Sequence, residues 1–172
     1  MRFRPALPAA GIAALLTAAA PAPPRAPHLP VATFDQLAKP LPLPYDEAAN
    51  AGKAVAAARE RARRSGKLLL IDLGGNWCLD CRLLAGTMET APLKAWLARR
   101  YEIVTVDVGR FDKNLQIPAR YGITGRLEGV PAVLVVDPRT DRLVNRASIA
   151  ALADARSMTP QALADWLAQW TR

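Results

Sequence analysis

Short apolar runs alternate with amphipathic segments along most of this chain. The first run, residues 68–73, is apolar at every position except Asp72. Apolar runs of this length are typical of strands that are buried on both faces of a sheet. The predicted strands are 68–73, 101–107, 130–136 and a short one at about 143–145. The turn residues at 138–141 predict that the last two strands form a hairpin.

Helical spacing of apolar residues marks the segments around these runs. Alanine and valine recur every three or four positions between Asp46 and Ser65, and Gly66 suits the end of a helix. Thr90 and Thr159, each with a proline close behind, are typical helix starts. The predicted helices are 46–65, one that carries Cys78 and Cys81 to about residue 87, 90–100, a short one at 114–121, and one from 159 toward the C-terminus.

The first residues have the pattern of a secretory signal peptide. Arg2 and Arg4 precede an apolar stretch of small residues, and Thr17-Ala18-Ala19 fits the small-x-small cleavage rule. Residues 1–19 are therefore predicted to be a signal peptide that directs export, so the protein is expected to be periplasmic or otherwise exported. The alternative is an uncleaved membrane anchor, but the apolar stretch of about 15 residues falls short of the roughly 20 that span a bilayer.

Two further divisions follow this leader. Eight prolines stand between residues 21 and 44, a density that disfavours both helices and sheet ladders. The segment 20–45 is therefore predicted to be extended, either as a tether or draped over the domain. The length of 172 residues and the 51% hydrophobic content indicate one soluble globular domain, at 46–172.

The formal net charge of +8 does not indicate a nucleic-acid-binding protein. The densest basic cluster lies between Arg59 and Lys67 and alternates with alanine and Glu60 on a predicted helix. No aromatic residues are interleaved with it, so a solvated helix face explains it better than a nucleic-acid site.

Cys78 and Cys81 are the only cysteines of the chain, in a C-x-x-C pattern at the start of a predicted helix. This spacing brings the two sulfurs within reach of each other and indicates redox chemistry. The alternatives are a structural disulfide and soft-metal binding. A bridge between positions i and i+3 closes almost no loop and stabilises little. A structural zinc site needs about four ligands, and His28 is the only histidine.

The order of these motifs resembles the thioredoxin family over residues 46–172. The motifs that carry the resemblance are Ile71-Asp72-Leu73, Trp77-Cys78-Leu79-Asp80-Cys81, Tyr121-Gly122-Ile123 and Gly129-Val130-Pro131. The resemblance implies an α/β, three-layer, thioredoxin-like fold, with a central mixed sheet flanked by helices and an added N-terminal helix. The form of the cysteine motif is similar to that of exported bacterial members of the family.

The site chemistry agrees with this resemblance. Cys78 at a helix N-terminus faces unpaired N–H groups that favour its thiolate, so it is the expected nucleophile. Cys81, one turn deeper, would resolve the mixed disulfide. Burial in an apolar strand would raise the pKa of Asp72 and suit it to exchange a proton with Cys81; the alternative is a satisfied polar group at a strand end. By resemblance, Val130-Pro131 is a cis peptide whose backbone pairs with substrate, and Trp77 is a contact surface, with ordinary packing as the alternative.

The chain departs from the common family pattern at three places. Leu79-Asp80 replaces Gly-Pro between the cysteines, and the Asp80 charge would disfavour the Cys78 thiolate if it points toward it. Thr105 stands where a lysine often neighbours the buried aspartate. The segment 124–129 lengthens the approach to Pro131 and adds charged residues.

The predicted function is that of an exported thiol-disulfide oxidoreductase that needs no cofactor. Its expected partners are protein thiols or disulfides and a membrane thiol-disulfide electron donor, with no nucleic acid and no membrane contact beyond an uncleaved leader. The alternative is a Cu(I)-handling metallochaperone of the same fold, since two thiolates suit that soft ion. The sequence leaves open whether the pair acts as oxidant, reductant or isomerase.

Overall fold

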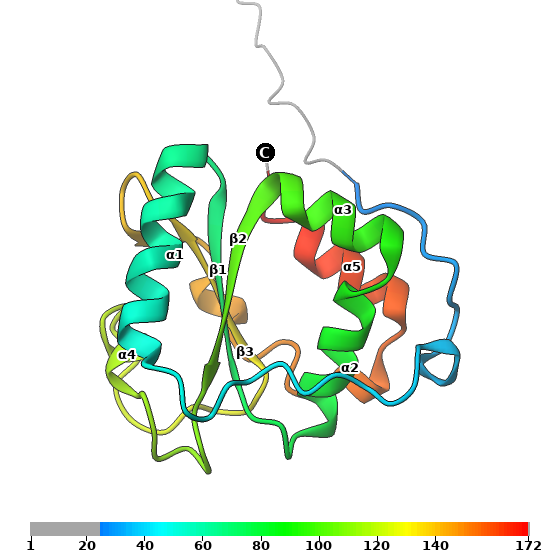
Figure 1. Cartoon of the computed structure of the whole chain (residues 1–172), viewed down its shortest axis with the longest axis horizontal. Helices are drawn as coiled ribbons and strands as arrows, with labels where there is room; N and C mark the ends of the chain where they lie inside the picture. The colour runs from blue at the N-terminus through cyan, green and yellow to red at the C-terminus, as the bar shows by residue number, and fades with distance from the viewer. Residues whose placement is uncertain (1–24, 172) are drawn as a thin grey trace, which may run out of the picture.

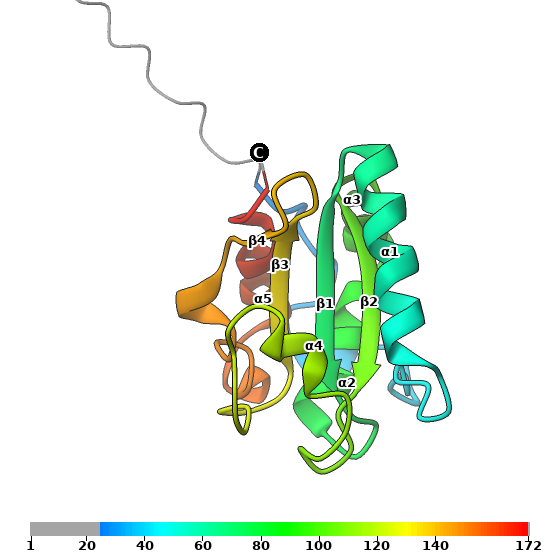
Figure 2. The ribbon, with the colours of Figure 1, turned by 90° about the vertical axis from the view of Figure 1, so that its left-hand side faces the viewer.

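The strand at the centre of the sheet is the apolar run that carries Asp72. The computed structural model describes residues 25–171, and in it β1 (Leu68–Gly74) pairs in parallel with β2 (Tyr101–Asp107). On its other edge β1 pairs antiparallel with β3 (Ala132–Asp137), which continues through the predicted hairpin to β4 (Arg142–Leu143). The sheet order is β2-β1-β3-β4, as Figure 2 shows side by side. The four predicted strands are all present, but β3 begins two residues later than predicted, after Pro131, and β4 ends at Leu143 rather than near residue 145.

Helices cover both faces of this mixed sheet, which gives three layers (Figure 1). The helices are α1 (Ala51–Ser65), α2 (Leu79–Met88), α3 (Ala91–Arg100), α4 (Gln116–Ala119) and α5 (Pro160–Ala168). The apolar faces of α1 and α4 share one core cluster with alternate residues of the strands. The other alternate residues pack with α2, α3 and α5. The predicted three-layer, thioredoxin-like arrangement is confirmed.

Successive side chains of β1 point to opposite faces of the sheet. Ile71 and Leu73 pack in the cluster that contains α1, whereas Leu70 packs in the cluster that contains α2, α3 and α5. All residues of β1 after Leu68 are buried, as expected for a central strand with helices on both sides. The polar side chain of Asp72 therefore lies in the interior of the protein.

The N-terminal helix begins five residues later than the sequence predicts. Asn50, rather than Asp46, caps it, because its side chain accepts a hydrogen bond from the backbone N–H of Lys53 at 3.0 Å. Asp46 instead accepts from the N–H of Ala48 within a turn. The predicted C-terminus is correct: Gly66 ends the helix with φ of 72°, a left-handed conformation that glycine adopts without strain.

Residues 25–45 drape over the domain (Figure 1). Leu29, Leu37, Leu41 and Tyr45 are buried, and a short 3-10 helix forms at Phe34–Gln36. The prolines exclude regular helix and sheet, so side chains of the domain hold the backbone of this segment instead. The predicted signal peptide lies outside the described residues. Between residues 25 and 171 no helix is both long and apolar enough to cross a bilayer.

Candidate active site

The two cysteines stand at the N-terminus of α2, directly after β1. Cys78 is the N-cap residue, with extended backbone angles, and its Sγ lies 3.1 Å from the backbone N–H of Cys81, which donates to it. The cysteines form a disulfide with their Cα atoms 5.3 Å apart. Cys78 keeps a small exposed fraction of 6%, while Cys81 is fully buried. A partner sulfur can therefore approach Cys78 more easily than Cys81.

The loop that leads into β3, the neighbour of β1, completes the surroundings of Cys78. The Val130-Pro131 peptide is cis, as the resemblance implies. The carbonyl oxygen of Val130 lies 3.4 Å from Sγ of Cys78. The sequence separates these residues by 52 positions, and the fold brings them into contact. A backbone acceptor thus sits beside the reactive sulfur.

Aromatic and arginine side chains form a surface next to Cys78. Trp77 is 42% exposed, and its Nε1 donates to the carbonyl of Gly109 at 2.8 Å. Its ring packs against Phe111, with centroids 6.0 Å apart, and Arg110 stacks on it at 4.4 Å. Arg126, from the charged segment 124–129, stacks on Phe111 in the same way. We call Trp77, Arg110, Phe111 and Arg126 the aromatic-arginine surface.

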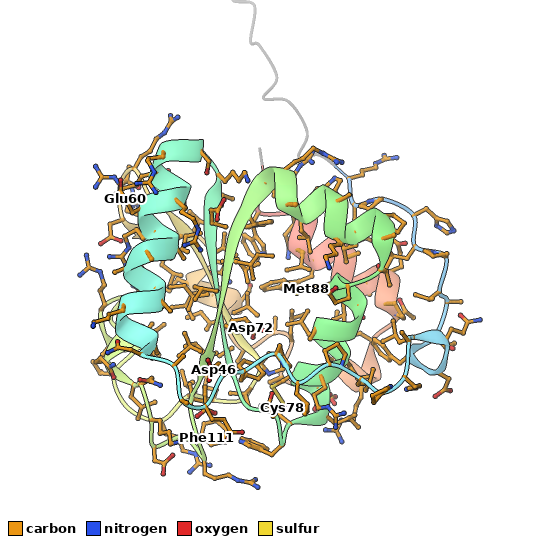
Figure 3. All side chains as sticks on the ribbon, viewed as in Figure 1. Asp46, Glu60, Asp72, Cys78, Met88 and Phe111 are labelled. Carbon is orange, nitrogen blue, oxygen red and sulfur yellow. A yellow bond between two sulfur atoms is a disulfide. The ribbon has the colours of Figure 1, made fainter. Side chains whose placement is uncertain are left out.

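Asp72 lies nearer the middle of the molecule than Cys78 and Phe111 do (Figure 3). It is 1% exposed, and the Tyr45 hydroxyl donates a hydrogen bond to its Oδ1 at 3.0 Å. Burial raises the pKa of Asp72 to about 7, although the hydrogen bond from Tyr45 acts in the opposite direction. Thr105, opposite Asp72 in the β1–β2 register, donates its hydroxyl to the carbonyl of Pro44. The Thr105 hydroxyl therefore does not hydrogen-bond to the Asp72 carboxyl, so it does not take the place of the lysine of the common family pattern.

The carboxyl of Asp72 also borders a cavity of about 680 Å³. Apolar residues of α2, α3, β2 and the proline-rich segment line most of it, and the exposed pair Lys94 and Glu89 also borders it. Asp72 therefore lies at the wall of this cavity, although its side chain is almost completely buried.

Asp80 does not act as the unpaired charge that the sequence suggests. Its carboxylate accepts hydrogen bonds from the backbone N–H of Arg156 at 2.9 Å and from the Arg156 guanidinium at 3.0 Å. Burial by itself would raise the pKa of Asp80, but the hydrogen bonds and charge of Arg156 outweigh it and hold the pKa below its ordinary value. The expected repulsion of a Cys78 thiolate is therefore largely cancelled by a cation at hydrogen-bond distance.

The described residues give no support to a metal site. No group of three or more histidine, cysteine, aspartate or glutamate side chains between residues 25 and 171 is placed to hold an ion. Cys78 and Cys81 are the only cysteines of the chain, and their geometry suits the exchange of disulfides by attack of one thiolate on another sulfur.

The structure thus brings together Trp77, Cys78, Cys81, Val130 and Pro131, with Asp72 beneath them. Four contributors were not predicted: Tyr45, Arg110, Phe111 and Arg156. Tyr45 falls in a proline-rich segment with no periodicity, and Arg156 lies 76 positions from the carboxylate it pairs with. The one signal for Phe111 was that it follows a strand end, where functional loops gather.

Comparison with known proteins agrees with this geometry. Residues 50–138 match a family model described as thioredoxin-like. Over 105 residues the chain is 30% identical to the thiol:disulfide interchange protein DsbD 1 of Pseudomonas aeruginosa, a match that covers 57% of this chain and 17% of that much longer protein. A crystal structure described as the disulphide isomerase from Xylella fastidiosa Temecula1 is 37% identical, with a TM-score of 0.68, and the match covers 75% of this chain and 97% of that one.

Asp72→Asn is expected to change how stability depends on pH. Because the folded protein raises the pKa of Asp72 to about 7, it retains a proton that the unfolded chain releases near pH 4. The contribution of Asp72 to stability is therefore lost as pH rises from about 4 to about 7. The free energy of unfolding of Asp72→Asn, relative to the parent, should rise by ~2–4 kcal/mol between pH 4 and pH 8. Urea unfolding at both pH values measures this. The exposed Asp35→Asn serves as control, and parallel curves for Asp72→Asn and the parent would contradict the buried, raised carboxyl.

Asp80→Asn is expected to destabilise the protein by about 1–2 kcal/mol at pH 7, since it breaks a pair that is buried on the carboxylate side and exposed on the Arg156 side. A carboxyl whose pKa is lower in the folded protein than in the unfolded chain stabilises the fold at pH values above the unfolded pKa. That contribution is lost as the pH falls through the folded pKa. The deficit of the variant should therefore shrink below about pH 4. Arg156→Gln and the double variant complete a cycle: additive losses would show that the two side chains do not interact.

Proposed function

This chain belongs to the thioredoxin-like family, and on that premise we propose that it is an exported thiol-disulfide oxidoreductase that acts on protein partners through Cys78 and Cys81. One observation carries the proposal. Cys78 caps the N-terminus of α2 in a disulfide with the fully buried Cys81. An attacking sulfur at the surface and a resolving sulfur behind it are the two components that disulfide exchange requires.

In the reducing direction, the Cys78 thiolate attacks one sulfur of a partner disulfide. A mixed disulfide forms, and the other partner sulfur leaves as a thiolate. Cys81 then loses its proton to the Asp72 carboxylate and attacks Sγ of Cys78, which releases the second partner sulfur as a thiolate. The partner gains two electrons and the cysteine pair loses two. The same steps in reverse oxidise a partner dithiol, and the difference in reduction potential sets the direction.

The position of Cys78 at the helix N-terminus supports its role as nucleophile. The backbone N–H groups of the first turn and the positive end of the helix dipole favour a negative sulfur. In the disulfide form the N–H of Cys81 already donates to Sγ of Cys78. The same donor is in place for the thiolate.

The partner docks on the exposed surface around Cys78. The backbone of Val130 beside Sγ pairs with an extended partner segment, and Pro131 shapes that loop. Trp77 and the neighbouring Leu79, which is 44% exposed, supply apolar contact area. The partner therefore presents an extended segment with apolar side chains next to its cysteine.

Export rests on the leader pattern at 1–19 and on the sequence alone. The chain spans about a sixth of the length of the DsbD 1 relative. The partners of that longer protein are therefore not assigned to this chain. A membrane thiol-disulfide electron donor is the proposed source of electrons. No observation favours the Cu(I) alternative, since the described residues offer no third ligand beside the two cysteines.

Cys78→Ser is expected to lose disulfide reductase activity to the level of buffer. The assay is the reduction of insulin disulfides in the presence of dithiothreitol, followed by turbidity, which the parent is expected to catalyse; the variant lacks the more accessible of the two sulfurs. The reduction potential of the parent, measured against glutathione, gives the direction: a value near −120 mV marks an oxidant, and one near −270 mV a reductant. Turnover retained in Cys78→Ser but lost in Cys81→Ser would reverse the assignment of the two sulfurs.

Cys81→Ser is expected to accumulate a mixed disulfide, because attack by Cys78 still occurs and resolution does not. Incubation with glutathione disulfide should add one glutathione per chain, detected by mass spectrometry under non-reducing conditions. Cys78→Ser is the matched control and should remain unmodified. Equal modification of the two variants would show that the buried Cys81 is as accessible as Cys78.

A further inference from the structure

The end of the proline-rich segment enters the interior beneath the cysteine pair. Tyr45 is 2% exposed, and its hydroxyl makes the hydrogen bond to Oδ1 of Asp72 at 3.0 Å. This is the one side-chain hydrogen bond that the Asp72 carboxyl receives from residues 25–171. A residue outside the region of the family match, 50–138, thus contacts the buried carboxyl of the site.

Polar contacts fix the position of this tyrosine. The side-chain amide of Asn76, in the loop before Cys78, binds the backbone of Tyr45 on both sides: its Oδ1 accepts from the N–H at 3.1 Å and its Nδ2 donates to the carbonyl at 2.8 Å. Thr105 of β2 donates to the carbonyl of Pro44, and the guanidinium of Arg82 in α2 donates to the carbonyls of Leu41 and Pro42. The elements that carry the site therefore also hold Tyr45.

Gly74 gives the tyrosine access to the cysteines. A Cβ atom at this position would overlap the Tyr45 hydroxyl and would lie 2.8 Å from Sγ of Cys81. Both groups therefore occupy the space beside one backbone position at the end of β1. The hydroxyl, the carboxyl that it binds and the resolving sulfur are gathered at the same point.

We propose that Tyr45 is a positioning residue for the resolving step: its hydroxyl holds Oδ1 of Asp72, so that the other carboxyl oxygen exchanges the proton of Cys81. The proposal rests on the thiol-disulfide exchange proposed above. When Cys81 attacks Sγ of Cys78, its proton moves to the Asp72 carboxylate, the Cys78–partner bond breaks, and the partner sulfur leaves as a thiolate. Tyr45 keeps its own proton throughout.

The charges around the carboxyl agree with this role. Burial raises the pKa of Asp72, and the Tyr45 hydrogen bond is the one opposing influence. Burial and the nearby carboxylates of Asp72 and Asp107 raise the pKa of Tyr45 far above its ordinary value, so the hydroxyl remains a donor. Lys67 and Glu102 line the same cavity but pair with each other at 3.2 Å. The share of Asp72 that is ionised at neutral pH therefore depends on Tyr45.

Tyr45→Phe tests the proposal because it removes the hydroxyl and keeps the ring. The readout is the rate of resolution, measured by stopped flow as release of a chromogenic thiol from its mixed disulfide with Cys78, from pH 5 to pH 9. The midpoint of the rise in rate should move up by about one pH unit from about 7, with a roughly fivefold slower rate at pH 7. The rate of the first attack by Cys78 should not change.

Tyr101→Phe is the matched control, since Tyr101 is also buried and makes a single hydrogen bond, to the carbonyl of Leu167 at 2.7 Å. It should reduce stability without moving the pH profile. Asp72→Asn should remove the rise in rate near pH 7 and leave only the rise at higher pH from ionisation of Cys81 itself, and adding Tyr45→Phe to it should have no further effect on the rate. A Tyr45→Phe profile that coincides with the parent and Tyr101→Phe would overturn the role of Tyr45. Loss of all exchange in the parent would instead overturn the proposed function.

Discussion

The burial of one carboxyl group inside the central strand is the constraint on which the site depends. Asp72 occupies a position that alternation assigns to the apolar interior, and an isolated carboxylate there costs several kcal/mol. The protein reduces this cost in two ways: the pKa rises, so that the group is partly neutral, and the Tyr45 hydroxyl binds the oxygen. The second way requires a chain segment that covers the site, which explains why a proline-rich stretch is anchored by side chains of α2, β2 and the cysteine loop.

The helix that carries the cysteines is held from several directions. Its N-terminus lies beside the Val130-Pro131 loop, Arg82 on its flank binds the covering segment, and Asp80 binds Arg156. These contacts join parts of the chain that are 40 to 76 positions apart. A helix fixed at several points keeps Sγ of Cys78 in one position relative to a docked partner. Less conformational entropy then has to be lost when the two sulfurs reach the geometry for reaction, which favours the reaction.

The sequence predicted the features that local chemistry determines. Strands, most helix ends and the cysteine pair follow from periodicity, capping residues and motif spacing, and the structure confirms the thioredoxin-like fold. The start of α1 was wrong because Asp46 and Asn50 are both good caps, and only the anchored path of residues 41–45 decides between them. The pairing of Asp80 with Arg156 and of Asp72 with Tyr45 arises from tertiary contacts, which no local pattern records. Residue type alone made Asp80 look like an unpaired charge.

A hydroxyl at this carboxyl has a different effect from the lysine that the family often places there. A lysine cation acts over several ångströms in a low dielectric, so it would stabilise the Asp72 carboxylate and both cysteine thiolates together. The Tyr45 hydroxyl carries no charge, and its hydrogen bond acts on one oxygen only. Proton transfer at Cys81 can therefore be adjusted here without also stabilising the Cys78 thiolate. The thiolate then depends on the helix N-terminus, with Asp80 already neutralised by Arg156. In the proposed mechanism, separate parts of the fold therefore control the acid-base group and the nucleophile.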